Sequence, residues 1–150
     1  REWAHDEALE WHLLEQPLHA GIKNWVRDLN RFYREQPALY ECDFAGDGFA
    51  WIDANDSELS VISFLRKSRS GEPILVVCNN TPMVRENYRI GVPRKGYWRE
   101  CLNSDAECYG GSGQGNLGGV DTTPLPAHGH YHSLTLRLPP LGVLFLKPEG

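Results

Sequence analysis

Residues 22–33 read IKNWVRDLNRFY, and this stretch separates a helical beginning of the chain from a long series of short strands. Its apolar residues recur at i, i+3, i+4, i+7, i+10 and i+11, the spacing of one wide face of an α-helix. They are Ile22, Trp25, Val26, Leu29, Phe32 and Tyr33. Such a face needs a packing partner, and the roughly 35 residues at the start of the chain are too few to enclose a core by themselves.

The first 40 residues are expected to form two helices. A short helix is predicted over residues 6–16, with Asp6 as its N-cap and Pro17 as the residue that stops it. A longer helix is predicted over residues 19–36, where Pro37 ends it. The chain also opens on Arg1 rather than on methionine. We therefore expect residues 1–40 to be a displaced piece of one domain of a longer protein, and residues 41–150 to be a complete second domain.

After residue 47 the pattern becomes that of short strands separated by glycine, proline and asparagine. The predicted strands cover residues 49–53, 59–67, 73–80, 87–92, 96–103, 133–138 and 143–147. Because no helix is expected between them, they indicate a mainly β fold, an antiparallel β-sandwich or barrel. Residues 104–132 have no periodicity, which is uncommon for about 30 residues inside a compact domain. This segment is either disordered or an ordered loop with a role.

Composition excludes several classes of partner. The net charge is -5, and the 15 lysines and arginines are scattered instead of forming a stripe that could follow a phosphate backbone, so nucleic acid is not expected. No apolar stretch approaches the ~18 residues of a membrane span, so no membrane is expected either. The 4 cysteines form no C-x-x-C pair, and a reducing, cytoplasmic location fits them best.

Two motifs point to cofactors but lack the context that those cofactors need. Residues 113–118 match G-x-G-x-x-G, yet no helix is expected after them, so they are interpreted as loop glycines. His128, His130 and His132 alternate and would place three imidazoles on one side of an extended segment, but no carboxylate or cysteine accompanies them. We predict no metal site and no cofactor, and we find no catalytic nucleophile in a recognisable setting.

The chain contains 5 tryptophans, whose flat rings can stack on a sugar as well as pack in a core. Trp51 follows a glycine-rich turn and is flanked by Asp53, Asn55 and Asp56, which could bond to hydroxyl groups. Core packing is the commoner role of a strand tryptophan, so both interpretations stay open here.

Ordered segments along essentially the whole chain resemble the C-terminal end of the 1,4-α-glucan (glycogen) branching enzymes, members of the α-amylase superfamily. The resemblance depends on many short matches in the right order, none of which is specific alone. They are REW at 1–3 followed by His5 and Asp6, LEWHLL at 9–14, HAG at 19–21, VRDLNR at 26–31, GFAW at 48–51, NNTP at 79–82, YWRE at 97–100, LNSD at 102–105, YGGSG at 109–113 and LPPL at 138–141. Departures occur at Ala4, where the family usually has asparagine, at Asn80, where an aromatic residue is common, and at His130, where arginine is frequent.

The resemblance implies that the helical start is the last part of a (β/α)8 barrel and that the strands form the all-β C-terminal domain of α-amylase type. Enzymes of this family cleave an α-1,4 linkage, hold the glucan as an ester on an aspartate and transfer it to a 6-hydroxyl, which requires two carboxyl groups. The family's catalytic carboxylates would all precede Arg1. We therefore expect no catalytic residue in this chain, no activity from it alone, and two partners: an α-glucan and the catalytic barrel.

The resemblance also suggests residues that could contact glucan. Trp51 is the first candidate in the β domain, with Trp98 and Tyr97 behind it. Trp3, His5 and Asp6 would follow the last barrel strand, on the side where such barrels keep their active sites, and are candidates for the border of the cleft. Two alternatives remain: a free-standing carbohydrate-binding sandwich, and a purely structural domain that never touches sugar.

Overall fold

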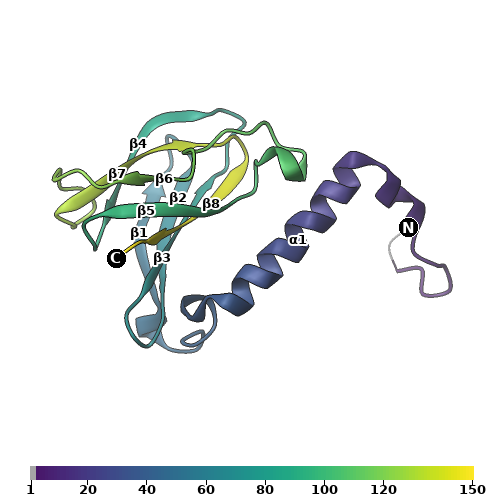
Figure 1. Ribbon diagram of the computed structural model, residues 1–150, viewed down its shortest axis with the longest axis horizontal. Helices are drawn as coiled ribbons and strands as arrows, with labels where there is room; N and C mark the ends of the chain where they lie inside the picture. The colour runs from purple at the N-terminus through teal and green to yellow at the C-terminus, as the bar shows by residue number, and fades with distance from the viewer. Residues whose placement is uncertain (1–2) are drawn as a thin grey trace.

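The apolar stripe of residues 22–33 lies on a long helix that leans against one side of a β-sandwich (Figure 1). The computed structural model describes residues 3–150. Its helical elements are the 3₁₀ turn η1 (Trp11–Glu15), the helix α1 (Pro17–Glu35), and the turns η2 (Pro37–Leu39), η3 (Gly46–Gly48) and η4 (Glu107–Tyr109). The strands are β1 (Phe49–Asp56), β2 (Val61–Lys67), β3 (Pro73–Asn79), β4 (Arg85–Val92), β5 (Tyr97–Asn103), β6 (Gly119–Asp121), β7 (His132–Leu138) and β8 (Gly142–Pro148).

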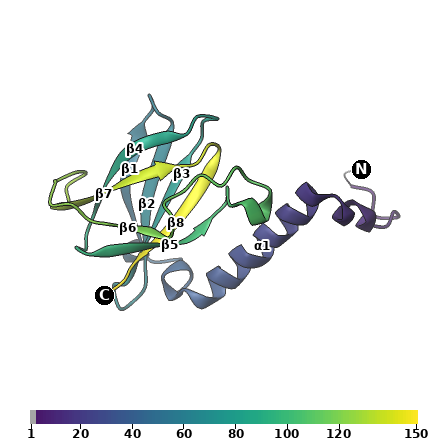
Figure 2. The same cartoon turned by 45° about the horizontal axis from the view of Figure 1, so that its top comes forward.

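The strands form two antiparallel sheets. One has six strands in the order β1-β2-β3-β8-β5-β6, and the other consists of β4 and β7 (Figure 2). The sheets face each other across a core to which both contribute, with Val61, Leu75 and Leu144 from the larger sheet and Ile90 and Leu134 from the smaller. The predicted mainly β, antiparallel sandwich is therefore confirmed.

The prediction of a helix over residues 6–16 is wrong. Only η1 forms there, with turn hydrogen bonds such as Leu13 N–H to Glu10 O (3.0 Å) and Gln16 N–H to Leu13 O (3.0 Å). Pro17 does not stop a helix but starts α1, because a proline at the first helical position gives up an N–H that would have no partner there. The end of α1 agrees with the prediction, since Gln36 is its C-cap and Pro37 follows.

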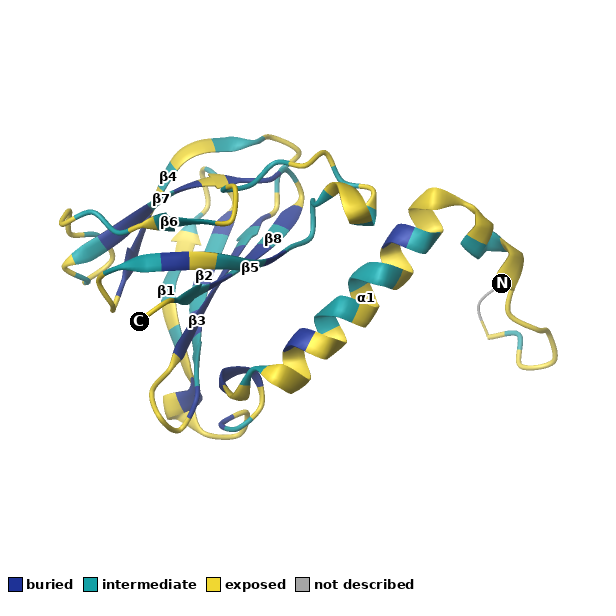
Figure 3. Ribbon diagram, in the orientation of Figure 1, coloured by how far each residue is buried: buried dark blue, intermediate teal, exposed yellow. Residues whose placement is uncertain are grey.

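The apolar stripe of α1 is divided between two surroundings. Trp25, Leu29 and Phe32 pack on the outer face of the large sheet, where Phe32 meets Phe145 edge-on at 5.6 Å. Ile22 and Val26 remain 63% and 48% exposed. Buried, intermediate and exposed residues alternate along α1 (Figure 3). Because successive helix residues point about 100° apart, a stripe this wide has one edge toward the sheet and one away from it. The packing partner that the stripe needs is therefore supplied in part by the large sheet of this chain, and the other edge of the stripe stays exposed.

Residues 104–132 are folded onto the sandwich. They contain η4 and β6, and Thr123 bridges Ser133 through paired main-chain hydrogen bonds of 2.8 and 3.1 Å. Sequence periodicity could not reveal β6, because it has three residues and pairs with β5 alone. Within residues 3–150, no helix is both long and apolar enough to cross a membrane.

Candidate functional site

An aromatic cluster lies on the outer face of the large sheet at its edge strand β1. Trp51 and Phe49 project from β1, and Phe64 projects from β2, where it is the direct cross-strand partner of Trp51. Alternation along β1 explains the arrangement, because Ala50 and Ile52 point the other way and pack against the core between the sheets. We call Phe49, Trp51 and Phe64 the edge cluster.

The edge cluster holds its tryptophan in a fixed orientation while leaving the ring accessible. The ring of Trp51 meets Phe49 edge-on at 4.9 Å and Phe64 edge-on at 5.8 Å, and Phe49 stacks on Phe64 at 5.2 Å. Trp51 is nevertheless 57% exposed, whereas most large apolar side chains of the strands are buried. A rigid, half-exposed indole offers a ligand an apolar surface and a hydrogen-bond donor. Because the ring is already held in place, little conformational entropy is lost when a ligand binds to it.

The polar residues that follow Trp51 in sequence make hydrogen bonds within the chain. A bulge between Trp51 and Asp53 turns the chain, and the Asp53 carboxylate accepts the Asn55 N–H at 2.8 Å. Asp56 accepts the hydroxyl of Tyr88 at 2.6 Å. The expectation that these carboxylates would bond to sugar hydroxyls beside Trp51 is not supported by their contacts.

A different polar group lies next to the edge cluster. Arg66 is the cross-strand partner of Phe49, and its guanidinium is hydrogen-bonded to the carboxylate of Asp43, which also accepts the Tyr33 hydroxyl at 3.2 Å. This guanidinium holds the pKa of Asp43 below its usual range, so the carboxylate stays charged. Asp43 and Arg66 are 23 residues apart, so no local sequence pattern could have paired them.

Trp98 is not available as a glucan contact. It is fully buried in the core between the sheets, and its indole N–H donates to the carbonyl of Arg94 at 3.1 Å. Its neighbour Tyr97 is partly exposed but lies on β5, and three strands separate β5 from β1. Trp98 therefore has to be removed from the candidates, and Tyr97 lies outside the edge cluster.

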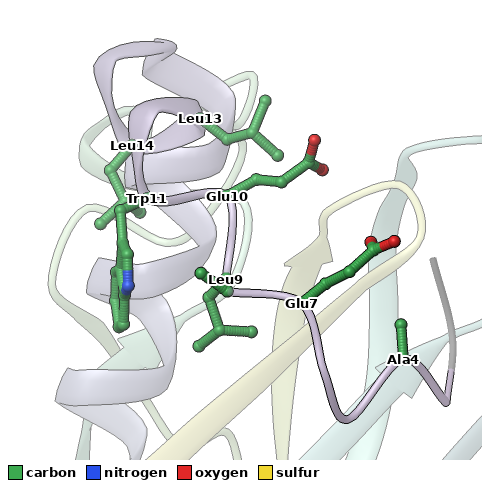
Figure 4. Close-up of a pocket in the computed structure, with 8 residues that line it drawn as sticks. Ala4, Glu7, Leu9, Glu10, Trp11, Leu13 and Leu14 are labelled. Atoms are coloured by element: carbon green, nitrogen blue, oxygen red, sulfur yellow. The ribbon is translucent and has the colours of Figure 1, made fainter.

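Trp3, His5 and Asp6 lie in a third place, before η1 at the end of α1 that points away from the sandwich (Figure 1). All three are exposed, Trp3 almost completely at 97%. The same segment encloses a hollow of about 670 Å³, with Trp11 and Leu14 on one side and Glu7 and Glu10 on the other (Figure 4). Among residues 3–150, those that line this hollow all come from positions 4–14.

The histidines of the 122–131 loop have structural contacts. His128 Nδ1 accepts the N–H of Gly91 at 3.1 Å, and its Nε2 lies 3.5 Å from the Asp53 carboxylate. Burial, together with His128 nearby, lowers the pKa of His130. Among the described residues, no group of three or more histidine, cysteine, aspartate or glutamate side chains is placed to hold a metal ion.

Comparison with known proteins places the sandwich in a family. Residues 51–149 match the family described as "Alpha amylase, C-terminal all-beta domain", which accounts for every strand after the beginning of β1. The chain belongs to the α-amylase C-terminal all-beta domain family. Membership fits the observed architecture, in which antiparallel strands alone form the core.

Sequence matches to individual relatives cover the helix as well as the sandwich. The "1,4-alpha-glucan branching enzyme GlgB" of Aromatoleum aromaticum is 66% identical over 149 residues, which are 99% of this chain and 23% of that protein. Proteins of the same name from Aquifex aeolicus and Cereibacter sphaeroides are 58% and 57% identical, over 100% and 99% of this chain and 24% and 20% of their own lengths. The chain thus spans about a fifth to a quarter of the length of these relatives.

Proposed function

We propose that this chain is the C-terminal part of a 1,4-α-glucan branching enzyme, an enzyme that cleaves α-1,4 linkages and forms α-1,6 linkages in glycogen synthesis. Residues 1–40 complete the (β/α)8 barrel, and residues 41–150 form the domain that supports it. The observation that carries the proposal is the 66% identity to a branching enzyme, which covers the helical segment and the sandwich without interruption. The catalytic carboxylates come from the barrel, and the four unpaired cysteines suit a cytoplasmic enzyme.

The exposed edge of α1 supports a second packing partner for the helix. Leu18, Ile22, Val26 and Tyr33 are 66%, 63%, 48% and 44% exposed. Leu9 and Trp11, just before α1, are 71% and 67% exposed. A row of large apolar side chains on one side of a helix is unfavourable in water and marks a contact surface. We assign this surface to the rest of the barrel.

The assignment is tested by grafting this chain into the Aromatoleum aromaticum relative in place of the 149 residues that it matches. We expect the graft to branch amylose, measured as the appearance of α-1,6 linkages by proton NMR, because a 66% identical segment keeps most of the packing surface. The relative without the segment, and this chain alone, should show no branching. A folded but inactive graft, or branching by the free chain, would contradict the proposal.

We propose in addition that the edge cluster binds α-glucan through Trp51. The Trp51 ring is 57% exposed and held in a fixed orientation by Phe49 and Phe64, which favours this role over a purely structural domain. Replacing Trp51 with alanine should weaken glycogen binding roughly fivefold, about 1 kcal/mol, with little change in stability. Affinity electrophoresis in gels with and without glycogen measures this effect.

Two variants make the Trp51 experiment specific. Trp51→Phe keeps an aromatic face and should keep part of the affinity. Tyr131→Ala removes another exposed aromatic ring, 86% accessible, that is not part of the edge cluster and should leave glycogen binding unchanged. Unchanged affinity of the Trp51→Ala variant would favour the purely structural domain. Glycogen binding by the chain together with an inactive graft would favour the free-standing binding module.

A further inference from the structure

Helix α1 and the loop that follows β5 are in direct main-chain contact. A Cβ atom placed on Gly21 would lie 2.2 Å from the carbonyl oxygen of Tyr109 and 2.7 Å from its carbonyl carbon. One placed on Gly110 would lie 2.9 Å from the side chain of Leu18. Real side-chain carbons do not approach main-chain atoms as closely as at Gly21, so the helix and η4 can meet here only because glycine occupies that position. At Gly110 the neighbour is the flexible end of a side chain, and it is the positive φ of +85° that favours glycine there.

The side chain of Tyr109 extends this contact along the helix. Its ring meets Trp25 edge-on at 5.3 Å, and its hydroxyl donates to Asp28 Oδ2 at 3.0 Å. Gly21, Trp25 and Asp28 are spaced i, i+4 and i+7, so one residue of the loop contacts two turns of the same helix face. A contact at several points resists rotation and sliding of the helix, which a single contact does not.

The acceptor in this contact is itself held in place. Arg27 Nε bonds to Asp28 at 3.0 Å, and Arg31 lies 3.2 Å from the same carboxylate. The hydrogen bond to Arg27 is the main cause of a lowered pKa for Asp28. Burial raises the pKa of Tyr109 to about 12. The hydroxyl therefore stays protonated and the carboxylate charged across the neutral range, so the bond persists throughout it.

The loop is as firmly fixed on its other side. The Asp105 carboxylate accepts the Ser112 N–H at 2.9 Å, the Ser112 hydroxyl at 2.7 Å and the Gln114 N–H at 3.0 Å. Glu100, on β5, accepts the N–H and the side-chain amide of Asn116 at 2.9 and 2.8 Å. The Asp105 bonds hold the loop together, and the Glu100 bonds join it to a strand of the large sheet, so the position of that sheet fixes the position of Tyr109.

We propose that residues 104–119 act as a clamp that sets the orientation of α1 on the sandwich, with Tyr109 and Asp28 as its positioning residues. The sheet holds the loop and the loop holds one edge of the helix. The other edge, with the exposed Ile22 and Val26, is thereby presented at one fixed angle. Where this bears on catalysis it rests on the proposed function: the β domain would then align the last barrel helix with the active site.

The clamp is tested first on the chain itself by hydrogen–deuterium exchange with the Tyr109→Phe variant. This change keeps the ring on Trp25 and removes only the hydroxyl. We expect amide exchange in α1 to become at least several-fold faster while β3 and β8 keep their rates. Tyr88→Phe is the matched control, because it removes a hydroxyl bonded to Asp56 at 2.6 Å inside the sandwich and should leave α1 unchanged.

Variants of Asp28 separate positioning from charge. Asp28→Asn keeps an oxygen that can accept the Tyr109 hydroxyl and should retain most of the protection of α1 against amide exchange. Asp28→Ala removes the acceptor and should speed amide exchange in α1 as much as Tyr109→Phe does. If Tyr109→Phe speeds exchange equally in helix and strands, or not at all, the clamp is wrong.

The same variants in the grafted enzyme test the catalytic consequence. Tyr109→Phe should lower kcat severalfold with little change in KM for amylose, whereas Asp28→Asn, which still offers an acceptor to the Tyr109 hydroxyl, should keep most of the parent's kcat. An unchanged kcat in an active graft would show that the clamp does not act on catalysis. An inactive parent graft would defeat the proposed function and still leave the exchange experiment to decide on the clamp.

Discussion

Replacing Trp98 with alanine is expected to remove a large part of the chain's free energy of unfolding. The side chain is completely buried between the two sheets, and its indole N–H satisfies the carbonyl of Arg94. Truncation would leave a cavity and remove the hydrogen bond to the Arg94 carbonyl, and the cavity costs roughly 3–5 kcal/mol for a tryptophan in a well-packed core. Most domains of this size have a free energy of unfolding of only about 5–15 kcal/mol.

Thermal denaturation followed by circular dichroism measures this effect, and we expect Tm to fall by roughly 10 °C or more. Trp51→Ala is the matched control, because the same truncation at a half-exposed ring leaves no enclosed cavity and should shift Tm by a few degrees at most. Equal shifts for the two variants would mean that burial does not distinguish these residues as the structure indicates.

Replacing Gly21 with alanine is the second change with a large expected effect. Alanine is the better helix former by about 1 kcal/mol, so helix propensity alone predicts that the variant is more stable. The added methyl group would instead meet the main-chain carbonyl of Tyr109, which lies 2.2 Å from its ideal position. Overpacking against main chain costs about 1–3 kcal/mol, so we expect a net loss of stability and a displaced helix.

The sign of the stability change decides this prediction. Urea unfolding gives the free energy, and the fluorescence of Trp25, whose ring touches Tyr109, reports on the displacement. Gly46→Ala is a suitable control, since nothing lies within 4 Å of the position that its Cβ would take. A Gly21→Ala variant more stable than the parent would show that helix and loop are not in main-chain contact.

The strands could be predicted because their residues alternate between two surroundings. In β7, Leu134, Leu136 and Leu138 are buried in the core, and the polar residues between them give the period of two. The helix predicted over residues 6–16 does not form, and the sequence could not show this because Asp6 and Pro17 each fit more than one structural role. Pro17 is equally suited to ending one helix and to beginning the next.

The candidate site was less predictable than the fold. Trp51 and Trp98 both lie in strands, and local sequence does not reveal which face of a strand is buried when each face carries a large apolar residue. The ordered loop before β7 was also hidden, because its hydrogen bonds join residues such as Asp105 and Gln114 through loop geometry and not through a repeating pattern.

The division of the α1 stripe has a consequence for where this polypeptide can be cut. Phe32 and Leu39, which precede residue 41, help to cover Ile74 and Val76 on the outer side of the large sheet. Cutting the chain at residue 41 would expose the apolar outer side of the large sheet and make the sandwich prone to self-association. The smallest piece of this chain that keeps the outer side of the large sheet covered is therefore the sandwich together with α1 and η2.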